Sequence, residues 1–349
     1  MDQTRWRQFR LAVATAVIAT AEASLQTALA QAPGCPTMRK INVGVSVAPP
    51  NVVHTAPYVA KALGLFARRC IDATVVQFEG GASATSTAAA AQGFAIASVS
   101  DVAVGRGLKV QQIWGLAPRM PQVYMVAEGI RSPADLKGKR MSATGGGVGG
   151  FNWRVGREIL RQAGLDVADA NFISSSTAGR LPGLIAGQID GVALHPEDVF
   201  LARKAKPGLN GLVQLVDLQP LSMFNAYGAS LDWIARDRPL LRDAVAAMIE
   251  ANRLAYNDKA KVVPAIMEAT QKSKEAVEYA IDELTKRCIW SVNEGFDDRR
   301  TEWSIDNSVA NGDIDAAKKP TVEQVANVKL ASEAVELAGG HVKIGNCTE

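Results

Sequence analysis

Apolar residues along this chain alternate between short unbroken runs and stretches with helical spacing. Runs at 40–47, 73–78, 94–99 and 110–117 predict strands. Between them, helical spacing of apolar residues follows Pro57, and an alanine-rich stretch follows a glycine turn with Ser83 as the expected N-cap. Repeated alternation of strand and helix is typical of a parallel sheet, so the chain is predicted to be of the α/β class.

The alternation restarts at residue 121 and gives way to long helices after residue 230. The simplest arrangement has two α/β lobes, the second inserted into the first, with extra C-terminal helices that return to the first lobe. We expect lobe I at 38–120 and 228–349, and lobe II at 121–227. The chain would cross between the lobes at a hinge near Pro121–Met125 and Met223–Tyr227.

The first 30 residues have the organisation of a secretory signal peptide. Three arginines between residues 5 and 10 precede the apolar run Leu11–Thr20, and a stretch of small residues follows. The apolar run is shorter than the roughly 20 residues that a membrane span needs. Cleavage after Ala30 is preferred, and cleavage after Ala23 is an alternative. Residues 1–30 are therefore left out of the fold, and the mature protein is expected outside the cytoplasm.

The four cysteines lie far apart and form no C-x-x-C pair. In an exported protein, disulfides are the default. Cys35 and Cys70 each come just before a predicted strand, so their thiols would meet at one sheet edge if these strands are parallel neighbours. Cys288 would then pair with Cys347 by elimination.

Composition and motifs exclude several classes of function. The formal charge of +3 includes the signal peptide, and no basic block with interleaved aromatic residues is present, so nucleic acid is not an expected partner. Three histidines form no metal-binding spacing, and no G-x-S-x-G motif occurs. Nothing in the sequence pairs Asp190 with Glu197 as acid and base. We predict neither a metal site nor catalysis.

The segment 142–160 holds Gly145, Gly147 and Gly150, which fit the G-x-G-x-x-G spacing of a dinucleotide site. Such a site needs an acidic residue about 20 residues later, at the end of the next strand. That strand ends in serines 174–176, and the nearest acidic residues precede it. No cofactor is therefore expected.

Glycine turns before helices have a second use, because they let the backbone approach a ligand and offer unpaired N–H groups. Turns of this kind also occur at 80–83, 98–101 and 175–180. In an open α/β sheet such turns lie at the carboxyl ends of the strands, where ligands bind. The helix N-termini favour a negatively charged or strongly hydrogen-bonding group, such as a carboxylate or sulfonate.

Four segments resemble the NMT1/THI5-like solute-binding proteins of ABC importers, a group that includes binders of aliphatic sulfonates, taurine, nitrate and thiamine-pyrimidine precursors. They are residues 56–81, 130–144, 181–194 and 230–256. The resemblance implies the type II periplasmic binding fold, a periplasmic location, and an inner-membrane permease with its ATPase as partner. A monomer is expected. The resemblance leaves two alternatives open. One is a receptor that presents its ligand to a membrane sensor, and the other, because yeast-type THI5 proteins share this fold, is an enzyme of pyrimidine synthesis.

The resemblance also singles out His54, because its "PN-x-x-H-T" setting is similar to the thiamine-pyrimidine branch. A tryptophan of that branch is absent here, where Ala48 and Pro49 stand. Arg180 is the best-placed cation for an acidic ligand, whereas Arg154 and Arg157 are expected to face solvent. The full set of candidate ligand-binding residues is Asn51, His54, Thr55, Tyr58, Gly81, Ser83, Ser100, Asp101, Gly146, Gly147, Gly149, Phe151, Ser175, Thr177, Arg180, His195 and Asn225.

Overall fold

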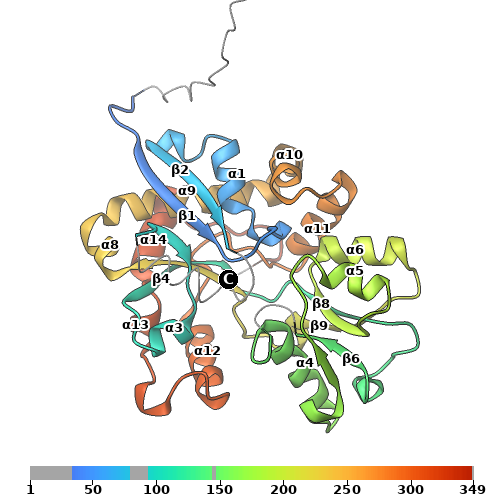
Figure 1. Ribbon diagram of the computed structural model, residues 1–349. Coiled ribbons are helices and arrows are strands. Elements are labelled where there is room, and N and C mark those ends of the chain that lie inside the picture. The colour runs from blue at the N-terminus through green and yellow to red at the C-terminus, as the bar shows by residue number, and fades with distance from the viewer. Residues whose placement is uncertain (1–33, 79–92, 144–146, 348–349) are drawn as a thin grey trace, which may run out of the picture.

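The computed structural model describes residues 34–78, 93–143 and 147–347, and these form two sheets that stand side by side (Figure 1). The first sheet has the strand order β2-β1-β3-β10-β4. Its strands are β1 (Arg39–Val45), β2 (Ile71–Gln77), β3 (Ile96–Ser98), β4 (Val110–Ala117) and β10 (Asn225–Ser230). We call this sheet and the helices packed on it lobe I.

The second sheet has the order β7-β6-β8-β5-β9 and, with its helices, is called lobe II. Its strands are β5 (Val123–Val126), β6 (Arg140–Ser142), β7 (Asn171–Ile173), β8 (Gly191–Leu194) and β9 (Asn210–Gln214). Side chains of β5 alternate between its two faces, as the strand geometry requires. Tyr124 and Val126 pack with helix α4 (Phe151–Gln162), whereas Val123 and Met125 pack under helices α5 (Arg180–Ile185) and α6 (Pro196–Ala205).

Helices cover both sheets. Those described in lobe II are α4 (Phe151–Gln162), α5 (Arg180–Ile185), α6 (Pro196–Ala205) and α7 (Leu215–Leu218). Those described in lobe I are α1 (Ala56–Ala62), α3 (Asp101–Gly105), α8 (Leu231–Arg236), α9 (Arg238–Asn257), α10 (Lys259–Thr270), α11 (Lys274–Lys286), α12 (Asp298–Ala310), α13 (Val322–Val325) and α14 (Val328–Leu337). The buried α9 carries much of the lobe I core. Helix α11 reaches across and packs against α6 of lobe II (Figure 1).

Both sheets are mixed, which corrects the expectation of a parallel sheet. Strand β10 runs antiparallel to β3 and β4, and β5 runs antiparallel to β8 and β9. The reason is the inserted lobe: β5 and β10 each begin after the chain has crossed from one lobe to the other. The α/β class itself is confirmed. The residue boundaries given above for the two lobes stay a prediction.

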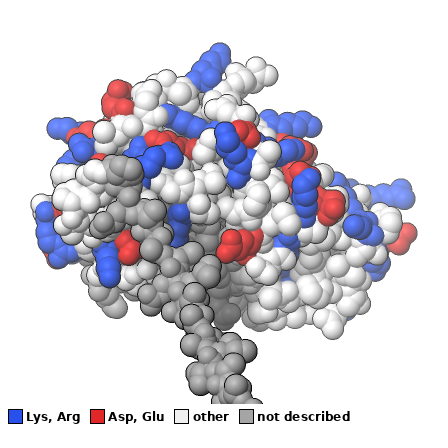
Figure 2. Space-filling view, turned by 90° about the horizontal axis from the view of Figure 1, so that it is seen from above, with Lys and Arg blue, Asp and Glu red and all other residues white. Residues whose placement is uncertain are grey.

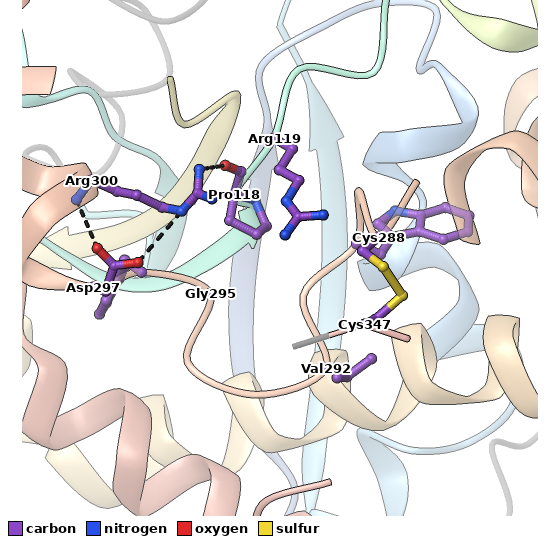
Figure 3. Close-up of a pocket in the computed structure, with 10 residues that line it drawn as sticks. Pro118, Arg119, Cys288, Val292, Gly295, Asp297, Arg300 and Cys347 are labelled. Atoms are coloured by element: carbon purple, nitrogen blue, oxygen red, sulfur yellow. Dashed lines mark hydrogen bonds and ion pairs between the residues drawn. A yellow bond between two sulfur atoms is a disulfide. The ribbon is translucent and has the colours of Figure 1, made fainter. Parts of the chain in front are cut away.

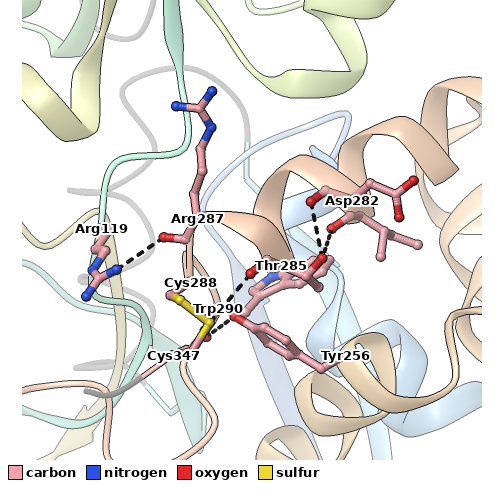
Figure 4. The surroundings of a disulfide bond; sticks show 9 residues. Arg119, Tyr256, Asp282, Thr285, Arg287, Cys288, Trp290 and Cys347 are labelled. Atoms are coloured by element: carbon pink, nitrogen blue, oxygen red, sulfur yellow. Dashed lines mark hydrogen bonds between the residues drawn. A yellow bond between two sulfur atoms is a disulfide. The ribbon is translucent and has the colours of Figure 1, made fainter. Parts of the chain in front are cut away.

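Both expected disulfides are present. Cys35 is bonded to Cys70 beside the parallel pair β1–β2, and Cys288 is bonded to Cys347. The second bond holds the C-terminal segment against the end of α11, close to Trp290 and Thr285 (Figure 4). This confirms the pairing predicted from the positions of the cysteines.

Figure 2 shows one face of the molecule. On the described residues of this face, basic and acidic side chains intermingle, and no region carries charges of one sign alone. Among the described residues, no helix has both the length and the apolar character to span a membrane. The predicted signal peptide lies outside the described residues.

Candidate functional site

The carboxyl edges of the two sheets face each other, and side chains from both lobes meet there. His54 comes from the short helix after β1, His195 from the end of β8, and Phe224 from the connection that leads into β10. Their rings lie close together: the centroid of Phe224 is 5.3 Å from that of His54 and 5.4 Å from that of His195. Phe151, the first residue of α4, approaches Phe224 edge-on at 6.2 Å.

Polar contacts surround this ring cluster. The Asn51 side-chain amide donates a 2.8 Å hydrogen bond to Oε1 of Glu197, and the Val52 backbone N–H donates to the same oxygen at 3.1 Å. Glu197 belongs to α6 of lobe II, so this carboxyl group joins the two lobes directly. Gln122 lies on the lobe II side, where its amide nitrogen is 3.2 Å from Nε2 of His195.

A buried ion-pair network completes the site. Arg180, the first residue of α5, donates to Asp198 at 3.1 Å and to the Asn51 side-chain oxygen at 3.3 Å. Lys272 from lobe I donates to the other Asp198 oxygen at 2.7 Å. We call the whole set the interlobe junction: Asn51, His54, Gln122, Arg180, His195, Glu197, Asp198, Phe224 and Lys272.

Several polar atoms of the junction are buried without a hydrogen-bond partner in the described structure. They are Nδ1 of His54 and of His195, Nε of Arg180, Oε2 of Glu197 and Oε1 of Gln122. Buried polar groups are nearly always hydrogen-bonded, and each exception calls for an explanation. Because these atoms gather at one place, the junction offers hydrogen-bonding capacity that the protein itself does not use.

Burial keeps both histidines uncharged. It lowers the pKa of His54 from 6.5 to about 3, with the positive charge of Arg180 as a second cause. The pKa of His195 is lowered well below 6.5, again first by burial and then by Arg180. Burial raises the pKa of Glu197, and the neighbouring Asp198 adds to this shift. With the Gln122 amide in this orientation, its nitrogen donates to Nε2 of the neutral His195 ring, and the proton of that ring is then on Nδ1.

These shifts predict a pH-dependent contribution to stability that can be isolated in His54→Asn. Below pH 6.5 the unfolded chain protonates His54, whereas the folded chain does so only near pH 3. Protons therefore favour the unfolded state as the pH falls. We expect the stability advantage of the wild type over His54→Asn to shrink by up to about 2 kcal/mol between pH 7 and pH 5. Urea unfolding of both proteins at the two pH values measures this, and a constant difference would contradict it.

The lobes touch at a second place, on α4. Arg154 pairs with Asp313 at 2.9 Å, and Arg157 donates to the Asn311 side chain at 2.6 Å. Asn311 and Asp313 follow helix α12 of lobe I. The sequence predicted that both arginines face solvent; each ends on a polar group of the opposite lobe, while the Arg154 side chain is still 42% exposed.

Other predicted site residues have partners within their own lobe. Ser100 caps α3, and Asp101 accepts hydrogen bonds from Ser304 at 2.8 Å and Ser308 at 3.1 Å on α12. Thr55 donates to the carbonyl of Val52 at 2.7 Å. Asn225 at the start of β10 bonds Ser98 at the end of β3 and Ser46 directly after β1.

The remaining candidates lie in the glycine loop before α4, on α1 and in the loop before α5, or outside the described residues. Gly147 and Gly149 have φ values of 68° and 83°, a region that favours glycine, and they precede α4. Tyr58 is half-buried on α1, and Ser175 and Thr177 lie in the loop before α5. Gly81, Ser83 and Gly146 lie outside the described residues.

Sequence reasoning missed Gln122, Glu197, Asp198, Phe224 and Lys272 as site residues. Asp198 could have been found, because "HPED" directly follows a strand at the same sheet edge that was used to select His195. Phe224 and Lys272 carry no such signal, since they enter the junction from a connection and from an interhelical turn of the other lobe.

Two hollows of the described surface lie around the second disulfide. One has a volume of about 30 Å³ and is lined by Arg119, Trp290, Phe296, Arg300 and the disulfide, among others (Figure 3). A shallower one of about 320 Å³ lies beside it near His341. At the junction the two lobes contact each other, through Asn51 with Glu197 and Arg180 and through Lys272 with Asp198.

Two α/β lobes joined by two connections, with polar groups of both lobes buried between them, define a type II periplasmic binding fold. The chain belongs to the NMT1/THI5-like family, whose model matches residues 51–282. No curated protein matches this chain in sequence.

Solved structures share the fold at low sequence identity. The aliphatic sulphonate-binding protein SsuA of Escherichia coli superposes with a TM-score of 0.66 at 18% identity, covering 82% of this chain and 91% of its own. The nitrate-binding protein NrtA of Synechocystis PCC 6803 gives 0.65 at 15% identity, with 86% and 89% covered. The desulfurization enzyme DszB gives 0.61 at 14% identity, with 85% and 99% covered. The fold is therefore shared by binding proteins and by an enzyme.

Proposed function

We propose that this protein is an extracytoplasmic solute receptor that captures a small organic molecule at the interlobe junction and delivers it to an inner-membrane ABC permease with its ATPase. The observation that carries the proposal is the set of buried, unpartnered polar atoms contributed by the facing lobes. A solute between the lobes would take up these hydrogen bonds. The predicted signal peptide and the periplasmic relatives support export to the periplasm, where a monomer would act.

Closure would follow directly from the contacts at the junction. Glu197 of lobe II accepts from Asn51 and Val52 of lobe I, so these hydrogen bonds form only when the lobes approach. A solute that contacts both lobes binds the closed form better than the open form, and its binding shifts the equilibrium towards closure.

The geometry supports a solute with a planar ring and no net charge. His54, His195 and Phe224 supply ring surfaces, and both histidines are neutral. The cations Arg180 and Lys272 already share Asp198, while Glu197 adds a second carboxyl group. A heteroaromatic ring with both donors and acceptors, such as a pyrimidine precursor, matches this balance.

A small organic acid is the second candidate, as the sequence predicted. One specific observation favours it: Nε of Arg180 is buried and donates to no described group. Together with Nδ1 of His195, it would offer two donors to a carboxylate or sulfonate. The sulphonate- and nitrate-binding relatives support this class.

Thermal unfolding of the mature protein, starting at Gln31, against pyrimidine precursors, sulfonates, carboxylates and nitrate tests the proposal. A ligand at 100 times its dissociation constant stabilises the protein by about 2.7 kcal/mol, which is readily detected. His195→Phe should keep the ring contact with Phe224 but remove the Nδ1 donor. We expect it to weaken binding of the active compound by about tenfold or more, measured by calorimetry.

His341→Phe is the matched control, because His341 is exposed and lies beside the second disulfide rather than in the interlobe junction. It should bind as the wild type does. Equal affinity of both variants would place the ligand away from the junction. A bound pyrimidine precursor that is converted to product would support the enzymatic alternative instead.

A further inference from the structure

The two interlobe connections run side by side on the lobe I surface. The first, residues 118–122, leads from β4 to β5, and the second, residues 219–224, leads from α7 to β10. The Phe224 backbone N–H donates to the carbonyl of Ala117 at 3.0 Å, so the connections are joined where they enter lobe I. Any opening of the lobes has to bend these two segments.

One side chain holds both connections. Nη1 of Arg300 donates to the carbonyl of Pro118 and to the carbonyl of Pro220, each at 2.9 Å. Arg300 lies in the first turn of α12, whose N-cap Asp297 accepts from the Arg300 backbone N–H at 2.7 Å. Figure 3 shows the guanidinium extended from α12 towards Pro118, with the Asp297 carboxylate beside the Arg300 side chain and joined to it by dashed lines. The side chain is 15% exposed, so its donors have little access to water.

A second arginine holds the first connection one residue later. Arg119 donates from Nη1 to the carbonyl of Arg287 at the end of α11, at 3.2 Å (Figure 4). Pro118 and Arg119 are thereby both bound to lobe I helices. Between these ties and lobe II lie residues 120–122 of the first connection and Gln219 of the second, which directly follows α7.

We propose that Arg300 is a positioning residue of the hinge: by binding Pro118 and Pro220 together, it confines bending to residues 120–122 and Gln219 and so sets the balance of open and closed forms. A planar guanidinium has the fixed geometry to hold two carbonyls at once. Without it, the two connections can separate, and the closed form loses its single hinge axis. The effect on ligand affinity rests on the proposed function, but the effect on lobe motion does not.

Distances between the lobes test the inference without any ligand. Lys61→Cys on α1 and Arg161→Cys on α4 replace exposed residues of lobe I and lobe II and accept spin labels. In Arg300→Met we expect the interlobe distance distribution to become at least about twice as wide, because domains joined by unconstrained connections move relative to each other. Arg299→Met, at the exposed neighbouring position, should leave it unchanged. An unchanged width in Arg300→Met would overturn the inference.

Arg300→Lys provides a second variant should Arg300→Met fold poorly. Lysine keeps the positive charge but replaces the planar guanidinium with a single ammonium group. We therefore expect the interlobe distance distribution to be wider than in the wild type and narrower than in Arg300→Met. A width equal to that of the wild type would again overturn the inference. With a ligand from the panel in hand, Arg300→Met should weaken binding about fivefold although no junction residue is changed. Because the distance measurement needs no ligand, a failed panel and a failed hinge are distinguishable.

Discussion

Asp198→Ala is expected to lower the free energy of unfolding by about 3–5 kcal/mol. The Asp198 side chain is 6% exposed and accepts from Arg180, which is 8% exposed, and from Lys272 of the opposite lobe. Removing the carboxylate leaves the Arg180 guanidinium buried without an anionic partner. The cost is that of an uncompensated charge, which is larger than the net value of the pair itself.

Urea unfolding measures this effect, with Asp282→Ala as the control. Asp282 pairs with Lys259 on the surface, where the two side chains are 62% and 37% exposed, so its loss should cost less than about 1 kcal/mol. The double variant Arg180→Met with Asp198→Leu removes both charges and should recover most of the lost stability. A cost for Asp198→Ala no larger than that of the control would show that Arg180 is not buried with this partner.

Gly295→Ala is expected to destabilise the protein by about 4 kcal/mol, through a steric clash and backbone strain together. Gly295 has φ of 74°, and a Cβ at this position would lie 1.8 Å from the carbonyl oxygen of Gly115 on β4. The obstacle is backbone, so it can move aside only if β4 shifts. Strand β4 is the edge strand of the lobe I sheet, where it pairs with β10, and it leads directly into the first connection between the lobes.

Gly129→Ala separates the two causes. Gly129 has φ of 87° but no atom within 4 Å of the added Cβ, so only the backbone strain of about 1 kcal/mol should appear. Thermal or urea unfolding of both variants gives the difference. Similar losses in the two variants would mean that the segment at 295 moves away from β4 freely.

Part of the interlobe junction follows from one rule applied to the sequence. Turns after parallel strands gather at one sheet edge, and this rule selects Arg180 and His195, while the family resemblance adds Asn51 and His54. All four lie in the interlobe junction. The rule fails where a side chain turns inward to its own lobe, as Asp101 does towards the serines of α12. Sequence position identifies the edge of the sheet but not the direction of a side chain.

The α/β class, the two lobes and both disulfides could be derived from the sequence by itself. These properties depend on local periodicity and on the positions of the cysteines next to predicted strands. Only the tertiary structure decided that Asp198 pairs with both Arg180 and Lys272, the latter from the other lobe. The same is true of the hydrogen bonds from Arg300 to both interlobe connections. Pairings such as that of Arg300 with Pro118 and Pro220 join residues far apart in the chain, and their partners are chosen by how the lobes pack.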